Sequence, residues 1–379
     1  MNDIKQKSLD YHSKFGGKIQ ITGKYPLETP EDLGMVYTPG MAYPCMEIAA
    51  DKTKAYDYTM KRRSVAIVSD GTAVLGFGNI GPEAGLPVME GKAMVFKRFA
   101  DIDAFPLCIA TNNPDEIIRF CQQIEPTFAG IHLEDIKAPE CFYIEKKLQE
   151  TLNIPVFHDD QWGTAIVALA GLINALKVVD KKVEDIKVVI NGAGAAGIAV
   201  AKILVEFGVK NVILLDSVGA IESSRTDLNE FKIEMLATTN PNSQAGELTE
   251  VIKGADVFMG LSKAGLLSQD MIRSMAEKPV VFAMANPIPE IMPPEALAAG
   301  AAVVATGRAD FPNQINNVLA FPGVFRGLLD SRATNLTLDM MVKAAVGLAG
   351  LINEPRADYI IPGAFDEGVC EAVAEAVGT

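Results

Sequence analysis

The chain has 379 residues, of which 49% are hydrophobic and 22% are charged, a balance typical of a globular protein rather than a disordered or fibrous one. Its formal net charge of −14 would repel nucleic acid and anionic membrane surfaces, so neither is an expected partner. The length predicts two domains, with three possible. The five cysteines include no CxxC pair, which argues against a disulfide scaffold or a structural zinc site. With no secretory signal recognised at the N-terminus, we expect a cytoplasmic protein.

The first 160 residues or so mix helical stretches with isolated strand-like segments, whereas the chain from about Asp185 alternates short apolar strands with helical segments. This alternation predicts right-handed βαβ units and a parallel, doubly wound sheet in the second half. The longest apolar helical stretch, residues 164–179, contains Asn174 and Lys177, and we expect it to be too short to span a membrane. The strand-like segments are residues 64–71, 105–110, 128–135, 186–191, 211–216, 256–261, 279–287 and 301–307.

A glycine-rich loop follows the predicted strand at residues 186–191 and opens an amphipathic helix. Its Gly-x-Gly-x-x-Gly spacing provides the tight turn and the close backbone approach that a dinucleotide pyrophosphate requires, and the helix N-terminus adds N–H donors. The next predicted strand ends at Asp216, 19 residues beyond the last glycine, where a carboxylate can bind the ribose hydroxyls. The predicted nucleotide-binding residues in the loop are Gly192, Gly194, Ala195, Ala196 and Gly197.

The charges around Asp216 bear on the choice of nucleotide. Its carboxylate would repel a 2′-phosphate, and Ser217 and Val218 offer no positive charge to receive one, which favours NAD over NADP. Arg225 and Lys210 could fold back toward the same place, so NADP stays possible. On the motif alone, a glycine-rich turn that binds no nucleotide is the alternative.

Two pairs of adjacent carboxylates end strand-like segments about 25 residues apart: Glu134 and Asp135, then Asp159 and Asp160. Because the carboxyl ends of parallel strands meet in one crevice, the pairs could come together and hold Mg²⁺ or Mn²⁺, hard cations that prefer oxygen ligands. Side chains of neighbouring extended residues diverge, so one aspartate could instead hold a cationic side chain. The alternative is that each pair only caps a helix or lies in solvent.

Several longer motifs resemble the malic enzyme family in its shorter prokaryotic form. They are YTPG, GLPVMEGK, LEDI, HDDQ, NGAGAAG, AMANPIPE and GRADFPNQINNVLAFPGVFRG, which cover nearly the whole chain in the order of the family. The resemblance implies an α/β protein with an N-terminal catalytic and metal-binding domain at 1–163. A Rossmann-type NAD-binding domain with a doubly wound parallel sheet would follow at 164–355, and a C-terminal helical segment at 356–379.

The activity that the resemblance implies is oxidative decarboxylation of (S)-malate to pyruvate and CO₂ with NAD(P)⁺ and Mg²⁺ or Mn²⁺, in a homodimer. Lys92 would take the proton of the C2 hydroxyl as general base, Tyr37 would protonate the enolate at C3, and Asp159 would pair with Lys92. Asn286 would meet the substrate or the nicotinamide, and Asn317 matches the substrate-binding asparagine of the family. The metal ligands carried over in this way are Glu134, Asp135 and Asp160.

Four positions depart from the family pattern. Ala73 stands where longer relatives carry a substrate-binding Arg, Trp162 where the short form usually has His, and Ser217 and Gly368 where Arg is expected. Two alternatives stay open: an oxaloacetate decarboxylase that oxidises malate weakly, and a non-catalytic nucleotide-binding sensor. A sensor could lose the catalytic side chains, and this chain retains them, which favours an enzyme.

Overall fold

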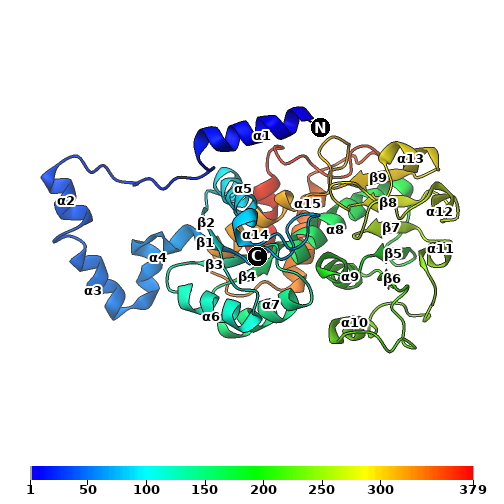
Figure 1. The fold of residues 1–379 in the computed structure, drawn as a ribbon, viewed down its shortest axis with the longest axis horizontal. Helices are drawn as coiled ribbons and strands as arrows, with labels where there is room; N and C mark the ends of the chain where they lie inside the picture. Colours follow the sequence, from blue (N-terminus) through cyan, green and yellow to red (C-terminus); the bar gives the residue numbers. More distant parts are fainter. Residues whose placement is uncertain (1, 379) are drawn as a thin grey trace.

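The computed structural model describes residues 2–378 and contains two parallel sheets that lie side by side (Figure 1). The first sheet has the order β2-β1-β3-β4, with all three pairings parallel. The predicted strand-like segments of the first part of the chain are therefore strands of one sheet. Their bounds are β1 Ser64–Ser69, β2 Asp103–Cys108, β3 Gly130–Leu133 and β4 Val156–His158.

The second sheet has the order β6-β5-β7-β8-β9, and all four pairings are parallel. The chain moves outward from β5 to β6 and then returns to the other side of β5 for β7, which is the doubly wound arrangement predicted from the sequence. The strands are β5 Lys187–Asn191, β6 Asn211–Leu215, β7 Val257–Gly260, β8 Val280–Ala283 and β9 Val303–Thr306.

Both sheets are buried between helices because successive strand residues point to opposite faces and both faces are apolar. In β1, Val65 and Ile67 pack toward α5, while Ala66 and Val68 pack toward α6 and α7. In the second sheet, α8 and α9 cover one face, and α11, α12 and α13 cover the other. These helices are α5 Pro82–Ala100, α6 Pro114–Ile124, α7 Glu140–Thr151, α8 Asp159–Val179, α9 Ala195–Phe207, α11 Leu248–Val251, α12 Gln269–Arg273 and α13 Pro293–Ala298.

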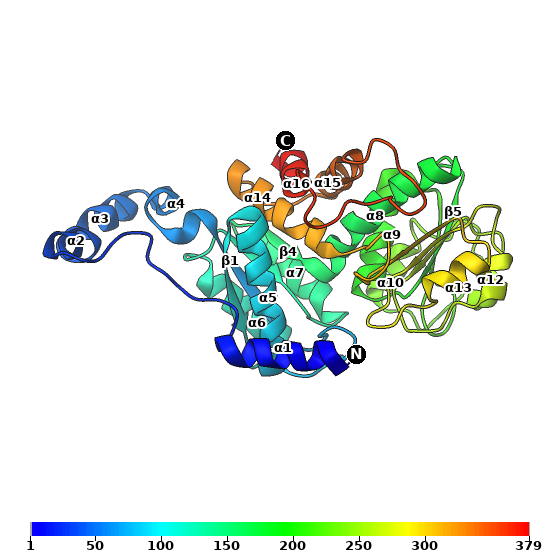
Figure 2. The same ribbon diagram turned by 90° about the horizontal axis from the view of Figure 1, so that it is seen from above.

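Helix α8 lies between the two sheets and contributes to their shared core (Figure 2). It has 21 residues and begins at Asp159, five residues before the predicted start. The whole helix is longer than the predicted stretch at residues 164–179, and by length and hydropathy alone it could cross a membrane. However, 72% of its most apolar window is buried inside the protein, which makes it a core helix.

The C-terminal helices return to the first sheet after β9. Phe321 and Phe325 of α14 lie 4.8 and 5.3 Å from the ring of Phe96 in α5, measured between ring centroids. Helix α16 packs on α14 and α15. The predicted division at residues 163 and 355 stays a prediction, but α14 already makes contacts within the first domain. The helices are α14 Phe321–Ser331, α15 Leu338–Gly350 and α16 Val369–Gly378.

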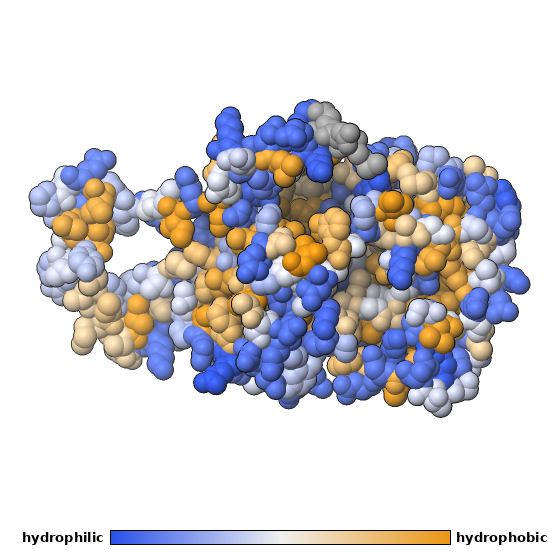
Figure 3. Space-filling view, in the orientation of Figure 1, coloured by the Kyte–Doolittle hydropathy of each residue, from blue (hydrophilic) through white to orange (hydrophobic). Residues whose placement is uncertain are grey.

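Residues 19–50, which we call the N-terminal arm, extend away from the rest of the molecule, with an ion pair from Lys24 back to Asp103 at 3.4 Å (Figures 1 and 2). The arm carries α2 and α3, and neither helix has a buried residue. Apolar residues gather on its surface (Figure 3). They include Ile21, Tyr25, Leu27, Met35, Tyr37, Tyr43 and Met46. The bounds of the N-terminal helices are α1 Asn2–Phe15, α2 Pro30–Val36, α3 Ala42–Ala50 and α4 Ala55–Tyr58.

Candidate active site

The two carboxylate pairs meet at the carboxyl edge of the first sheet. Strands β3 and β4 are neighbours, and Leu133 lies opposite His158 in their register, so the residues that follow each strand come together. One carboxylate oxygen each of Glu134, Asp135 and Asp160 lies within 4.8 Å of the others. Glu134 and Asp135 are 3% exposed and Asp160 is partly buried, so the cluster lies largely inside the protein rather than on a solvated loop.

The cluster fits a hard divalent cation. Asp135 Oδ2 is buried and has no hydrogen-bond partner among the residues that the structure describes, and the Asp135 N–H donates to Asp160 Oδ2 at 2.9 Å. Burial, with the charges of Glu134 and Asp160, raises the pKa of Asp135 to about 9. Repelling carboxylates with a spare oxygen are what a cation would satisfy, and an all-oxygen donor set suits Mg²⁺ or Mn²⁺.

The first turn of α8 directs the two aspartate side chains to different partners. Asp159 and Asp160 are its first two residues, so their side chains point about 100° apart around the helix axis. Asp160 lies in the cluster with Glu134 and Asp135, and Asp159 is bonded to Lys92. The divergence predicted for extended residues is therefore present, but it arises from a helix. The positive end of the helix dipole also favours both charges.

Lys92 of α5 reaches into the cluster from the neighbouring helix. Its Nζ donates to Asp159 Oδ2 and lies 3.2 Å from Glu134 Oε1, and it stands 4.6 Å from the ring centroid of Phe321. Burial by itself would lower the pKa of Lys92, but the charges of Asp159 and Glu134 outweigh it and raise the pKa above its ordinary value. The structure thus places the predicted base beside the predicted metal ligands.

Tyr37 is not part of this assembly. It caps the C-terminal end of α2 in the N-terminal arm, and 61% of the residue is exposed. Figure 1 shows α2 at the far end of the arm, away from the carboxyl ends of β3 and β4. One chain therefore brings Lys92 and the carboxylates together but leaves the predicted acid outside.

The two predicted asparagines lie on different segments: Asn317 packs beside the first residues of α8, and Asn286 meets the loop that follows β1. Asn317 begins the short 3-10 helix η3 (Asn317–Leu319), and a Cβ added to Gly163 would collide with both Asn317 and Asp159, so η3 packs on the first turn of α8. Asn286 follows β8, and its carbonyl lies so close to Gly76 that a side chain there would clash. The loop after β1 therefore meets the loop after β8, which brings the two domains into contact.

The glycine-rich loop adopts the predicted turn. Gly192 has φ +130°, and its N–H donates to the Leu215 carbonyl at 2.9 Å. A Cβ at Gly192 would meet the backbone of Leu261, and one at Gly197 would meet the Gly192 carbonyl, so only glycine fits at either position. Helix α9 begins directly after Gly194 with Ala195 and Ala196, and this open N-terminus is where a pyrophosphate is expected.

The carboxylate of Asp216 is held by two cations. Arg225 donates to its two oxygens at 2.9 and 3.0 Å, Lys232 donates at 2.6 Å, and the Val218 N–H adds a bond at 2.9 Å. Burial would raise the pKa of Asp216, but the bonds from Arg225 and Lys232 lower it well below its usual range. Only 10% of the Asp216 side chain is exposed. The Asp216 carboxylate is therefore already hydrogen-bonded to Arg225 and Lys232, whereas the sequence predicted a carboxylate free to bind the ribose hydroxyls.

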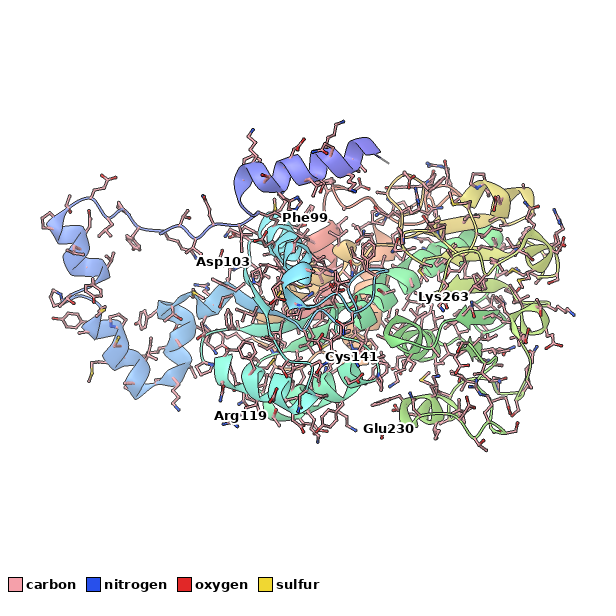
Figure 4. All side chains as sticks on the ribbon, viewed as in Figure 1. Phe99, Asp103, Arg119, Cys141, Glu230 and Lys263 are labelled. Atoms are coloured by element: carbon pink, nitrogen blue, oxygen red, sulfur yellow. The ribbon has the colours of Figure 1, made fainter. Side chains whose placement is uncertain are left out.

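Supporting residues that the sequence interpretation missed surround the site. Glu145 of α7 accepts from Trp162 Nε1 at 3.0 Å, Gln161 Nε2 at 2.9 Å and the His158 N–H at 3.1 Å. Trp162, the departure from the usual His, therefore has a buried partner that ties α7 to α8. Burial raises the pKa of Glu145 to about 7. Cys141 in the first turn of the same α7 is labelled in Figure 4.

Glu290 plays a similar supporting part in the second domain. Its carboxylate is fully buried and accepts from the Ser262 and Ala285 N–H groups, each at 3.1 Å, so it joins the loops that follow β7 and β8. Glu290 is the last residue of the AMANPIPE motif, although no role was predicted for it. No local motif signals Glu145, because its partners lie on other elements.

The remaining departures have plain structural settings. Ala73 donates its N–H to the Asp135 carbonyl at 2.9 Å, so this position does border the cluster, although a methyl group cannot grip a carboxylate. Gly368 has φ +82°, a conformation in which a side chain would be strained. Ser217 is exposed beside Asp216.

Comparison with known families decides the relationship. The model of the malic enzyme N-terminal domain matches residues 16–149, and that of the malic enzyme NAD-binding domain matches residues 162–377. The chain belongs to the malic enzyme family. It is a malic enzyme that carries out oxidative decarboxylation of malate with NAD(P). The predicted family and the predicted α/β fold are confirmed.

Individual relatives are similar over nearly the full chain. The bifunctional malic/malolactic enzyme of Bacillus subtilis is 54% identical over 99% of this chain and 92% of its own length. The NAD-dependent malic enzyme of Geobacillus stearothermophilus is 56% identical over 96% of this chain and 76% of its own length. The NADP-dependent malic enzyme of Halomonas elongata is 47% identical over 100% of this chain and 93% of its own length. The crystal structure of the NAD-dependent malic enzyme of Thermotoga maritima superposes with a TM-score of 0.95 and 48% identity, covering 98% of each chain.

Proposed function

We propose that this malic enzyme prefers NAD⁺, requires Mg²⁺ or Mn²⁺, and works as a homodimer in the cytoplasm. The observation that carries the proposal is the contact of Lys92 with a buried carboxylate cluster, in a chain whose second domain has the dinucleotide loop. The NAD-dependent relatives from Geobacillus stearothermophilus and Thermotoga maritima support the cofactor preference. The NADP-dependent relative leaves use of NADP⁺ open.

Glu134, Asp135 and Asp160 would hold the metal. Their oxygens lie close together, and within residues 2–378 Asp135 Oδ2 has no hydrogen-bond partner. When bound, Mg²⁺ or Mn²⁺ supplies Lewis-acid polarisation of the malate oxygens, and NAD(P)⁺ accepts the hydride. Without a bound cation, the negative charge of these carboxylates would also repel the malate dianion.

Lys92 must lose its own proton before it can act as a base, and the charge of a divalent cation bound beside it would lower its pKa and favour that loss. The neutral Lys92 amine would then take the proton from the C2 hydroxyl of malate, while Asp159 holds Nζ in place. The fixed position of Nζ, between Asp159 and Glu134, limits the directions from which it accepts that proton. Asn286 and Asn317 bind the substrate carboxylates, with Asn286 also near the nicotinamide. These amides take over part of the grip that an Arg would provide at Ala73.

Tyr37 returns a proton to C3 after CO₂ has left, and it acts in the active site of the partner subunit. Its exposure on the N-terminal arm supports this assignment, as does the large apolar surface of the arm, which a monomer would leave in water. A phenol is a weak acid, which suits it to protonating a strongly basic carbon.

The experiment follows the absorbance of reduced nicotinamide with purified enzyme, L-malate, Mn²⁺ and either NAD⁺ or NADP⁺, with and without EDTA. Pyruvate and lactate are assayed afterwards, because the Bacillus subtilis relative is named for malolactic activity as well. We expect EDTA-sensitive reduction, pyruvate in equal amount, and a higher rate with NAD⁺. Reduction that EDTA leaves unchanged would contradict the metal assignment, and a higher rate with NADP⁺ would contradict the preference.

A further inference from the structure

His132 in β3 is a buried polar ring in an otherwise apolar place. It is 0% exposed, and its ring centroid lies 5.3 Å from that of Phe96, 5.4 Å from that of Phe321 and 5.8 Å from that of Phe325. Burying an imidazole among aromatic rings costs free energy unless its nitrogens are hydrogen-bonded. An aromatic or aliphatic side chain would fill the same space without that cost, so the histidine calls for a physical reason.

One ring nitrogen has a partner and the other does not. His132 Nε2 lies 2.6 Å from Glu134 Oε2, whereas Nδ1 is buried without a hydrogen-bond partner among the described residues. Residues 132 and 134 lie two apart along one extended segment, so their side chains share a face. Because a carboxylate can only accept, the Nε2 atom carries the hydrogen and donates it to Glu134.

The alternative role, that of a metal ligand, is opposed by the position of Lys92. His132, Glu134 and Asp159 offer ligand atoms within 4.8 Å of one another and are all buried. However, the Lys92 ammonium group already contacts both Glu134 and Asp159 at that place. A second cation there would face a buried positive charge, so this trio is not open to a metal while Lys92 is charged.

We infer that His132 is a positioning residue, which fixes the orientation of the Glu134 carboxylate for the metal and for Lys92. With Oε2 held by His132, the carboxylate plane is set and Oε1 faces Lys92 at 3.2 Å. Each carboxylate oxygen has two acceptor sites, so the bond from His132 leaves Glu134 able to bind a cation. This inference rests on the proposed metal site at Glu134, Asp135 and Asp160.

The expected consequence concerns metal affinity before catalysis. Removing a partner that orients a metal ligand lowers the affinity by about 10- to 100-fold. His132→Phe keeps an aromatic ring in the Phe96, Phe321 and Phe325 surroundings but removes the donor. His132→Gln removes the ring but places an amide N–H at about the reach of Nε2, so it should restore most of the affinity.

The test is calorimetric titration of Mn²⁺ into the whole enzyme without nucleotide or malate. We expect His132→Phe to bind Mn²⁺ at least about tenfold more weakly than the native enzyme, and His132→Gln within about threefold of it. The matched control is His158→Phe, which removes an equally buried ring whose Nε2 lies 3.8 Å from Asp160 Oδ2, beyond hydrogen-bond distance. This control should leave Mn²⁺ affinity within about threefold of native.

Native affinity in His132→Phe, or equal loss in His132→Phe and His132→Gln at unchanged unfolding temperature, would overturn the positioning role. If the native enzyme itself bound no Mn²⁺, the proposed metal site would fail instead, so the two failures are distinct. Should His132→Phe not fold, ¹⁵N NMR of the native His132 ring decides the matter. A proton on Nε2 is expected, and a neutral ring protonated on Nδ1 would contradict the donation to Glu134.

Discussion

The carboxyl edge of the first sheet and the N-terminal arm differ in almost every physical respect. At the sheet edge, Glu134 and Asp135 are 3% exposed, and Lys92 is fixed between two carboxylates with 12% of its side chain exposed. In the arm, α2 and α3 have no buried residue, and Tyr37 is 61% exposed. Yet the proposed reaction needs a base from one region and an acid from the other.

The difference teaches that the fold of one chain brings Lys92 and the carboxylates together but leaves Tyr37, the proposed acid, away from them. Parallel strands place the carboxylates without help, because their ends converge wherever the sheet forms. The arm contacts too little of its own chain to be positioned by it, and its apolar side chains need another surface. The predictions that follow test each half separately.

The largest effect is expected from Lys92→Ala. Loss of a general base lowers kcat by about 10²- to 10⁴-fold. NAD⁺ affinity should stay within about twofold of native, because Lys92 lies in the first domain and the dinucleotide loop in the second. Steady-state kinetics and nucleotide titration measure the two quantities.

The matched control for Lys92→Ala is Lys97→Ala, five residues along the same helix, whose amine pairs with Asp101 and Asp103 at the surface. It should leave kcat unchanged. Turnover by Lys92→Ala near the native rate would remove Lys92 from the role of base.

Metal affinity should rise with pH. Asp160 has its pKa raised to about 6 and Asp135 to about 9, by burial first and by neighbouring carboxylates next. A cation binds the deprotonated forms, so protons are released on binding and the affinity for Mn²⁺ increases from pH 6 toward pH 9. Calorimetry in two buffers of different ionisation enthalpy measures the proton release.

The same experiment with Asp135→Asn gives the control for the pH effect. The variant should bind Mn²⁺ more weakly and release fewer protons between pH 7 and 9, because its amide does not titrate in that range. An affinity that is flat from pH 6 to 9 in the native enzyme would contradict the assignment of these carboxylates as ligands.

In the arm, Met35→Asp should weaken dimerisation by about tenfold or more, because it would place a charge in a surface that we expect the partner to bury. Met35 is 72% exposed in the single chain, so the substitution should not disturb the folding of the monomer. Sedimentation equilibrium measures the dimer. Val346→Asp, on the exposed side of α15, is the control and should leave dimerisation as it is. Equal behaviour of the two variants would argue against an arm-mediated dimer.

The smallest effect is expected from Trp162→Phe. Loss of the indole N–H leaves Glu145 with fewer donors, which costs about 1–3 kcal/mol of unfolding free energy. Urea denaturation measures the loss. Asn174→Ala serves as a comparison, because it removes a buried polar group of α8 that lies far along the helix from the metal ligands. It should also destabilise the protein, and it should leave the affinity for Mn²⁺ unchanged. If Trp162→Phe were as stable as the native enzyme, the hydrogen bonds from Trp162 to Glu145 would contribute nothing to the free energy of unfolding.

Much of the fold could be predicted because its signals are local. Apolar strands alternate with helices along the second half, and glycine is required at Gly192 and Gly197 by backbone contacts that the motif anticipates. The meeting of Glu134 with Asp160 also followed from sheet topology alone. These features depend on spacing within one segment or on the rule that parallel strands end together.

The rest depends on contacts between distant segments. Arg225 and Lys232 occupy Asp216, and the motif for a ribose-binding carboxylate contains no information about such partners. The start of α8 at Asp159 was missed because the carboxylates looked like the end of a strand. Nor could the exposure of Tyr37 be foreseen, since the residues of the arm do not reveal whether the core of their own chain or another surface covers them.

The most direct test of the central account mixes two inactive variants, Tyr37→Phe and Lys92→Ala, under conditions that exchange subunits. If Tyr37 serves the partner's active site, half of the subunit pairs are mixed and each contains one intact site, so activity should return to about a quarter of the native value. Mass spectrometry confirms that mixed dimers have formed. Mixed dimers with no activity above that of the two parent variants would contradict a site built from Lys92 of one subunit and Tyr37 of the other.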